Sequence, residues 1–155
     1  MINILIGSDH AGYDIKTKII QHLNNNFTIE NLIDIGPFND DRCDYPDIAH
    51  TLCNKLIEYK EQDMKYIGIL ICGTGIGMSI TANKHKDIRC SLCHNEYTAE
   101  MTRLHNNSNV LALGSRVLDE NMIMNIVNKF INILNCCFWE FIKRIMSTIF
   151  NDNFL

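Results

Sequence analysis

Residues 69–79 read ILICGTGIGMS. An apolar run ends at Cys72, and three glycines then alternate with other residues up to Gly77. Glycine lets the backbone approach a bound group closely and turn its N–H groups toward it. The positive end of a following helix favours negative charge and the anionic form of a nearby thiol. The stretch therefore predicts a strand, a turn and a helix start, with a candidate base at Cys72 beside an oxyanion site.

Several familiar phosphate-binding loops do not fit this spacing. A Walker loop ends in Gly-Lys followed by Ser or Thr, whereas Met78 follows Gly77 here. The dinucleotide fingerprint places its last glycine one residue further along, and a cysteine phosphatase would need arginine where Met78 stands. Two interpretations remain: a loop of inward-pointing amides beside a reactive thiol, or a tight turn around a buried structural cysteine.

The composition is that of an ordinary globular protein. The 155 residues are 46% hydrophobic and 21% charged, which predicts a single domain spanning 1–155 with a substantial core. A net charge of −4 argues against general attraction to nucleic acid. The start of the chain has no basic leader, and no apolar run is long enough to span a membrane. We therefore expect a cytoplasmic protein whose seven cysteines are reduced thiols.

Strand-like and helix-like segments alternate along the chain. Short apolar runs typical of strands occur at 2–7, 28–35, 66–71, 88–92 and 109–113. Apolar residues at helical spacing lie between these runs and most clearly over 123–134, and 138–150 form a last amphipathic stretch. This alternation predicts an α/β fold in which helices cover both faces of a five-stranded parallel sheet.

Polar residues follow the predicted strands at the ends where ligands of parallel sheets bind. These strand ends carry Ser8-Asp9-His10, Cys72-Gly73-Thr74 and Gly114-Ser115-Arg116. We expect the three ends to share one rim of the sheet. Asp9 can cap the helix that follows, and His10 either binds phosphate, transfers protons or is simply solvated. Arg116 follows the end of a predicted strand, where its guanidinium can bind a phosphate.

Two further motifs have competing interpretations. His105 ends a predicted helix, where it either interacts with the helix dipole or acts as a general acid near the same rim. Residues 90–94 read CSLCH, which matches haem attachment and a redox or zinc pair. We reject haem attachment and a redox or zinc pair for this motif, because it falls in a predicted strand. Cys90 and Cys93 would point to opposite faces of that strand.

Four motifs occur together in order: SDHAG at 8–12, DYPD at 44–47, ICGTGIGMS at 71–79, and HN at 105–106 with NVLALG at 109–114. Over about residues 2–130 the chain resembles the type B ribose-5-phosphate isomerases and the related galactose-6-phosphate isomerase subunits. The resemblance implies a Rossmann-like three-layer sandwich with a C-terminal helix. It also implies interconversion of ribose 5-phosphate and ribulose 5-phosphate, without metal or organic cofactor.

The resemblance implies a role for each matching residue. Cys72 would move a proton between carbons 1 and 2, while Thr74 and the neighbouring amides hold the enediolate. Asp9 would move protons on the sugar oxygens, and His105 would open the furanose ring. The implied substrate-binding residues are His10, Tyr45, Gly73, Gly75, Ile76, Gly77, Asn106, Arg116 and Arg144.

The resemblance also implies a homodimer or homotetramer whose site combines two subunits. His105 and Asn106 would then serve the Cys72 of the neighbouring subunit. One departure concerns the two arginines with which the family usually clamps phosphate near its C-terminus. An alignment without gaps places the second on Arg144 but the first on Glu140, whose carboxylate would repel phosphate.

Two alternative functions stay open. One is the same reaction on a six-carbon sugar phosphate, such as galactose or allose 6-phosphate. The other is a non-catalytic sugar-phosphate-binding subunit, which Glu140 favours. The presence of Cys72, Asp9 and His105 argues against the second alternative, because a binding protein has little use for a positioned base.

Overall fold

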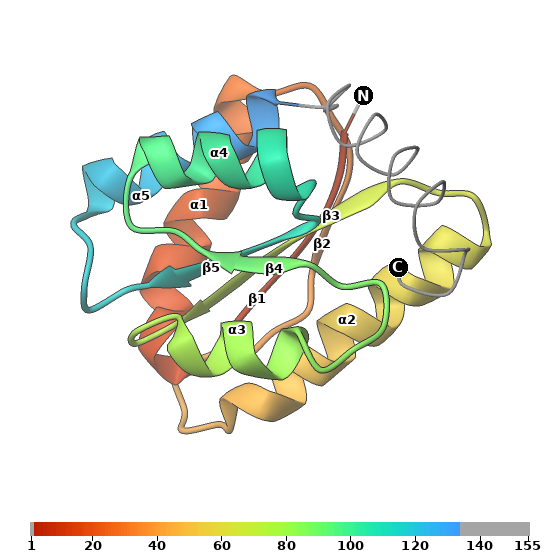
Figure 1. Ribbon diagram of the computed structural model, residues 1–155. Coiled ribbons are helices and arrows are strands. Elements are labelled where there is room, and N and C mark those ends of the chain that lie inside the picture. Colours follow the sequence, from red (N-terminus) through yellow and green to blue (C-terminus); the bar gives the residue numbers. More distant parts are fainter. Residues whose placement is uncertain (1, 134–155) are drawn as a thin grey trace.

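A computed structural model describes residues 2–133, in which strands and helices alternate (Figure 1). The strands are β1 (Ile2–Ser8), β2 (Ile29–Asp34), β3 (Tyr66–Cys72), β4 (Cys90–Leu92) and β5 (Val110–Gly114). The helices are α1 (Tyr13–Asn26), α2 (Tyr45–Glu61), α3 (Ile76–Ala82), α4 (Glu96–Asn106) and α5 (Glu120–Asn132), with a short 3-10 helix, η1 (His10–Gly12). The strands form one five-stranded sheet in the order β2-β1-β3-β5-β4, and all of its pairs are parallel. This arrangement confirms the predicted Rossmann-like α/β fold.

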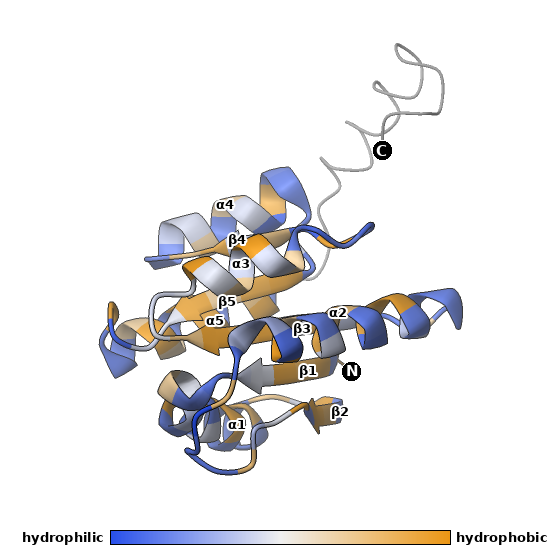
Figure 2. Cartoon of the chain, turned by 90° about the horizontal axis from the view of Figure 1, so that it is seen from below, coloured by the Kyte–Doolittle hydropathy of each residue, from blue (hydrophilic) through white to orange (hydrophobic). Residues whose placement is uncertain are grey.

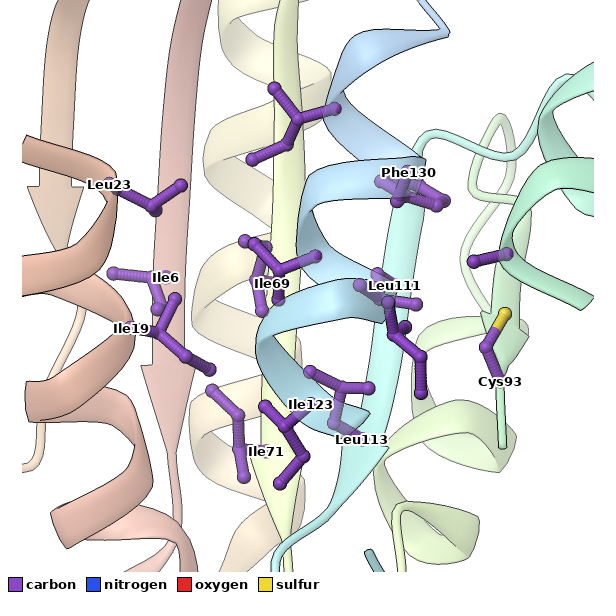
Figure 3. Close-up of a cluster of buried hydrophobic side chains, with 14 of the residues drawn as sticks. Ile6, Ile19, Leu23, Ile69, Ile71, Cys93, Leu111, Leu113, Ile123 and Phe130 are labelled. Carbon is purple, nitrogen blue, oxygen red and sulfur yellow. The ribbon is translucent and has the colours of Figure 1, made fainter. Parts of the chain in front are cut away.

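Each face of the sheet is covered by helices, so the molecule has three layers (Figure 1). Helices α1, α4 and α5 pack on one face, and α2 and α3 on the other. Figure 3 shows the first interface, where Leu23 of α1 and Phe130 of α5 lie over Ile6, Ile69 and Leu111 of the strands. Hydrophobic residues accordingly gather on the strands, while the helices carry hydrophilic stretches (Figure 2).

The helical spacing in the sequence identifies the buried faces correctly. In α2 the buried residues are Ala49, Leu52, Cys53 and Leu56, and in α5 they are Ile123, Ile126, Val127, Phe130 and Ile131. The expected amphipathic stretch over 138–150 lies outside the described residues.

Strand β4 is shorter than the sequence predicts. It begins at Cys90 instead of residue 88, because Asp87 has a positive φ of 68° and the Ile88 N–H closes a turn onto the His85 carbonyl at 3.3 Å. The side chains of Cys90 and Cys93 belong to the cores on opposite faces of the sheet, as expected. Burial raises the pKa of the Cys93 thiol to about 11, which keeps it neutral at pH 7.

The sheet has its topological switch point between β1 and β3. These strands are neighbours, yet α1 follows β1 on one face and α3 follows β3 on the other. In open parallel sheets, ligands bind in the crevice outside the carboxyl ends of such a strand pair. The fold therefore places its natural binding crevice beside Asp9 and Cys72.

Candidate active site at the carboxyl edge of the sheet

Cys72 is the last residue of β3, and only 5% of its side chain is exposed. Its sulfur accepts a hydrogen bond from the Gly75 N–H at 3.1 Å. The loop that follows the strand therefore turns an amide back toward the thiol, which is the arrangement that the glycine spacing predicts. Water has little access to the sulfur, so charges that develop beside it interact strongly with nearby dipoles.

The glycines of the loop are required by what surrounds them. Gly75 has a φ of 76°, and a Cβ there would lie 2.5 Å from the Leu92 side chain. A Cβ on Gly77 would lie 2.7 Å from the ring of Tyr45. The aromatic side chain of Tyr45 is therefore packed against the start of α3. A side chain at Gly75 would therefore clash with Leu92, and one at Gly77 would clash with Tyr45.

The start of α3 presents backbone donors to the same crevice. The first hydrogen bond within the helix runs from the Ser79 N–H to the Gly75 carbonyl at 3.0 Å. The helix itself therefore supplies no acceptor for the N–H groups of residues 76–78. The Thr74 hydroxyl accepts from the Ile76 N–H at 3.3 Å, which places the hydroxyl beside these donors. Thr74 and Ile76 are both exposed at this edge.

Asp9 joins the ends of β1 and β3. Its N–H donates to the Ile71 carbonyl at 3.0 Å, and its carboxylate Oδ1 accepts from the N–H groups of Ala11 at 2.9 Å and Gly12 at 3.1 Å. The helix-cap interpretation is thus correct, and it accounts for one carboxylate oxygen. Asp9 is 7% exposed at the switch point.

His10 is oriented by the backbone of a distant segment. Its Nδ1 lies 3.2 Å from the Cys43 carbonyl. A carbonyl only accepts, so Nδ1 carries a proton and Nε2 is the nitrogen that takes up or releases the second one. In the protonated state both nitrogens donate, which suits an anionic ligand.

The third strand end carries Ser115 and Arg116. The Ser115 N–H and hydroxyl both reach the Cys72 carbonyl, at 2.9 and 3.2 Å, and the hydroxyl also reaches the Ala11 carbonyl at 2.7 Å. The Arg116 N–H donates to the Gly73 carbonyl at 3.0 Å, and its guanidinium lies over Gly73. The three strand ends therefore meet at one rim, as predicted.

His105 and Asn106 do not reach this rim within their own chain. They end α4, which leads into the first residues of β5, so they are exposed at the amino edge of the sheet. Cys72 pairs with Gly114 at the other end of β5, on the carboxyl edge. The expectation that His105 lies near the same rim in one chain is therefore wrong, because α4 runs antiparallel to the strand that it precedes.

A cluster of hydroxyls fixes the end of α4. The Thr102 hydroxyl lies 2.6 Å from that of Ser108, which lies 2.5 Å from that of Ser91 in β4. Asn107 ends the helix with a positive φ of 46°. These contacts hold the loop that carries His105 and Asn106. Serine and threonine are common residue types, so the sequence gave no signal of this hydroxyl cluster.

A buried ion pair holds the wall of the crevice after β2. Lys16 is 1% exposed, and its Nζ lies 2.7 and 2.8 Å from the two carboxylate oxygens of Asp34 and 2.6 Å from the Pro37 carbonyl. The segment fixed in this way leads to Cys43, whose carbonyl orients His10. Lys16 shares the inner face of α1 with Ile19 and Leu23, and that position is the signal that could have identified it.

Some expectations fall elsewhere. Arg144 and Glu140, which bear on a phosphate clamp, lie outside the described residues. Within residues 2–133, no group of three or more His, Cys, Asp or Glu side chains is arranged to hold a metal ion. None of the helices in that range is long and apolar enough to cross a membrane.

Comparison with known proteins gives a consistent picture. A family model described as Ribose/Galactose Isomerase matches residues 4–139. A putative sugar phosphate isomerase of Rickettsia conorii is 42% identical over 129 residues, which cover 83% of this chain and 85% of the relative. The ribose-5-phosphate isomerase B of Escherichia coli is 40% identical over 131 residues, covering 83% and 82%.

Solved structures agree with the sequence relatives. The type B ribose 5-phosphate isomerase of Leishmania infantum has a TM-score of 0.83 at 33% identity, covering 96% of this chain and 95% of its own. The ribose-5-phosphate isomerase B of Mycoplasma genitalium, solved with bound ribulose-5-phosphate, has a TM-score of 0.78 at 37% identity and covers 97% of both chains.

Proposed function

Because this chain belongs to the ribose/galactose isomerase family, we propose that it interconverts ribose 5-phosphate and ribulose 5-phosphate. The observation that carries the proposal is the thiol of Cys72, which is nearly buried and accepts a hydrogen bond from the Gly75 N–H. Asp9, His10 and Arg116 surround the same crevice. A proton acceptor, backbone donors and groups suited to phosphate thus meet at one rim.

The proposed reaction moves one proton between two carbons. The Cys72 sulfur takes the proton from carbon 2 of the open-chain aldose, and the electron pair moves to the oxygen on carbon 1. The resulting enediolate is stabilised by the N–H groups at the start of α3 and by Thr74. Asp9 moves the proton from the oxygen on carbon 2 to that on carbon 1. Cys72 then returns its proton to carbon 1, which completes the ketose.

His10 and Arg116 bind the phosphate in this proposal. The Nε2 atom of His10 faces away from its Cys43 contact, and the Arg116 guanidinium lies over Gly73. Tyr45 closes the side of the crevice against Gly77 and contacts sugar hydroxyls. The remote phosphate anchors the sugar so that its reacting carbons lie beside the sulfur.

We expect the chain to prefer the five-carbon substrate. The segment after β2 is fixed by Lys16, by the hydrogen bond of the Tyr13 hydroxyl to the Phe38 carbonyl at 3.3 Å, and by the Cys43–His10 contact. Because three contacts fix this segment, we expect that it adapts poorly to a longer sugar. The predicted kcat/KM for ribose 5-phosphate exceeds that for allose or galactose 6-phosphate by about 10–200-fold.

A steady-state assay with all three sugar phosphates tests this preference. Equal or faster turnover of a six-carbon sugar phosphate would contradict it. Absence of turnover with every sugar phosphate would instead favour the non-catalytic binding subunit.

We further propose a homodimer in which His105 and Asn106 complete the rim of the partner. His105 opens the furanose ring there, and Asn106 contacts a sugar hydroxyl. Exposed apolar side chains near the rim support such a contact, since Ile76 is 52% exposed, Ile80 56% and Val117 56%. Apolar groups that gather beside a polar site are typical of a surface that another protein covers.

Mixed dimers test the shared site. Cys72→Ser and His105→Asn each inactivate both sites of their own homodimer. Co-expression of the two variants yields mixed dimers in which one site keeps both residues. With random pairing the activity recovers to about a quarter of the wild-type value per site, because the two-fold symmetry gives one intact site in each mixed dimer. A mixture no more active than the separate variants contradicts a shared site.

A further inference from the structure

A second cluster of chemically active groups lies away from the rim, between α2 and the turn after α3. His50 is an exposed residue of α2, and His85 lies in that turn, where its N–H donates to the Ala82 carbonyl at 3.1 Å. His50 Nδ1 and His85 Nε2 are 2.7 Å apart, with ring centres separated by 4.9 Å and ring planes inclined by 57°. Two imidazole nitrogens from different elements therefore face each other directly.

Such a pair holds one proton in the gap between its nitrogens. One nitrogen donates and the other accepts, an arrangement that two neutral imidazoles can form. Protonation of both rings would place two positive charges face to face. Accordingly, partial burial and the neighbouring His50 ring lower the pKa of His85. Neutral imidazole is also the form that binds transition metals.

We propose that His50 and His85 form a two-ligand site for a divalent transition-metal ion that prefers imidazole, such as Ni²⁺, Cu²⁺ or Zn²⁺. Water completes the coordination, because no third His, Cys, Asp or Glu joins the pair among residues 2–133. The site is therefore open and exchangeable, unlike a closed structural site with four protein ligands. It is independent of the isomerase reaction.

The separation of the two nitrogens is close to that required by a shared metal ion. Two metal–nitrogen bonds of about 2.0–2.1 Å at a right angle separate the nitrogens by about 2.9 Å. The present gap is 2.7 Å. Since the His50 side chain is exposed, its ring can turn until both lone pairs converge on the ion. The proton in the gap moves to the outer nitrogen of the same ring, so both rings stay neutral and no proton is released.

Metal binding would fix α2 against the end of α3. The start of α3 already contacts α2 through Gly77 and Tyr45, and a metal bridge adds a link between α2 and the turn after α3. An ion that binds only the folded chain stabilises it by mass action. At a free concentration of 100 times Kd, the ratio of folded to unfolded protein rises about 100-fold.

Calorimetric titration of the full-length protein with Ni²⁺ tests the site, since Ni²⁺ binds imidazole and does not oxidise thiols. Wild type is expected to bind one Ni²⁺ per chain. His50→Gln and His85→Gln each lower the affinity by at least about tenfold. The matched control is His22→Gln, because His22 Nε2 already contacts Asn128 at 2.7 Å and faces no second imidazole. This control keeps the wild-type affinity.

A thermal melt with and without Ni²⁺ gives a second readout. The melting temperature rises with Ni²⁺ in wild type and in His22→Gln, but not in either variant of the pair. Melts in metal-free buffer show that the variants fold, and their isomerase activity without metal stays at the wild-type level. Unchanged Ni²⁺ affinity in either pair variant overturns the proposal. So does a lack of saturable binding by wild type, or binding that is lost only in Cys72→Ser.

Discussion

Replacing Cys72 by serine is expected to lower kcat for ribose 5-phosphate by about 10²–10⁴-fold while KM stays close to the wild-type value, as for loss of a general base. Serine is small enough for the site and keeps an acceptor for the Gly75 N–H, which lies 3.1 Å from the sulfur. Its hydroxyl is a far weaker acid than a thiol, so it provides almost no anionic base near pH 7. The crevice and its phosphate-binding groups are unaffected.

Cys43→Ser is the matched control for this variant. Cys43 lies beside His10, which it contacts through its backbone carbonyl and through its thiol, and serine keeps an acceptor at both places. We therefore expect Cys43→Ser to retain near wild-type kcat and KM. Steady-state kinetics on both variants make the comparison, and full activity in Cys72→Ser would show that the base lies elsewhere.

Lys16→Met is expected to cost about 1–3 kcal/mol of the free energy of unfolding, because it removes a buried charged donor from a carboxylate that is 28% exposed. The Lys16 side chain is 1% exposed and satisfies both carboxylate oxygens of Asp34 as well as the Pro37 carbonyl. Methionine fills similar space but leaves the Pro37 carbonyl without this donor and the Asp34 carboxylate with only the Gly36 N–H, at 2.8 Å. Urea denaturation measures the loss as a lower midpoint.

Lys18→Met provides the contrast two residues away. Lys18 pairs with Glu120 at 2.6 Å, but both side chains are about half exposed, and solvent screens such pairs. Its urea midpoint is expected to match that of wild type. A second variant, Lys16→Met combined with Asp34→Asn, removes the unpaired charge and recovers part of the loss. Equal midpoints for Lys16→Met and Lys18→Met would contradict the role assigned to the buried pair.

The fold was largely predictable because it depends on patterns that are local in the sequence. The spacing of Ile19 and Leu23, or of Leu52 and Leu56, identifies the buried face of a helix without knowledge of its partners. The start of β4 was not predictable in this way. Asp87 adopts a left-handed backbone conformation that its residue type permits but does not require.

The candidate site was predictable where one strand end carries it. The glycine loop after Cys72 predicts backbone amides near a thiol, and the Gly75 N–H donates a hydrogen bond to the sulfur. The position of His105 depends instead on the direction of α4, which ends where β5 begins and therefore at the opposite edge of the sheet. Lys16 was missed because a lysine is usually exposed, and only its partner Asp34 explains its burial.

Incubation with ribose 5-phosphate in deuterium oxide tests the proposed proton transfer most directly. If Cys72 carries the proton between carbons 1 and 2, NMR of the sugar shows deuterium on carbon as ribulose 5-phosphate appears. Under the same conditions Cys72→Ser forms ketose and deuterated sugar about 10²–10⁴-fold more slowly. Deuterated ketose formed by Cys72→Ser at the wild-type rate would contradict proton transfer through the thiol.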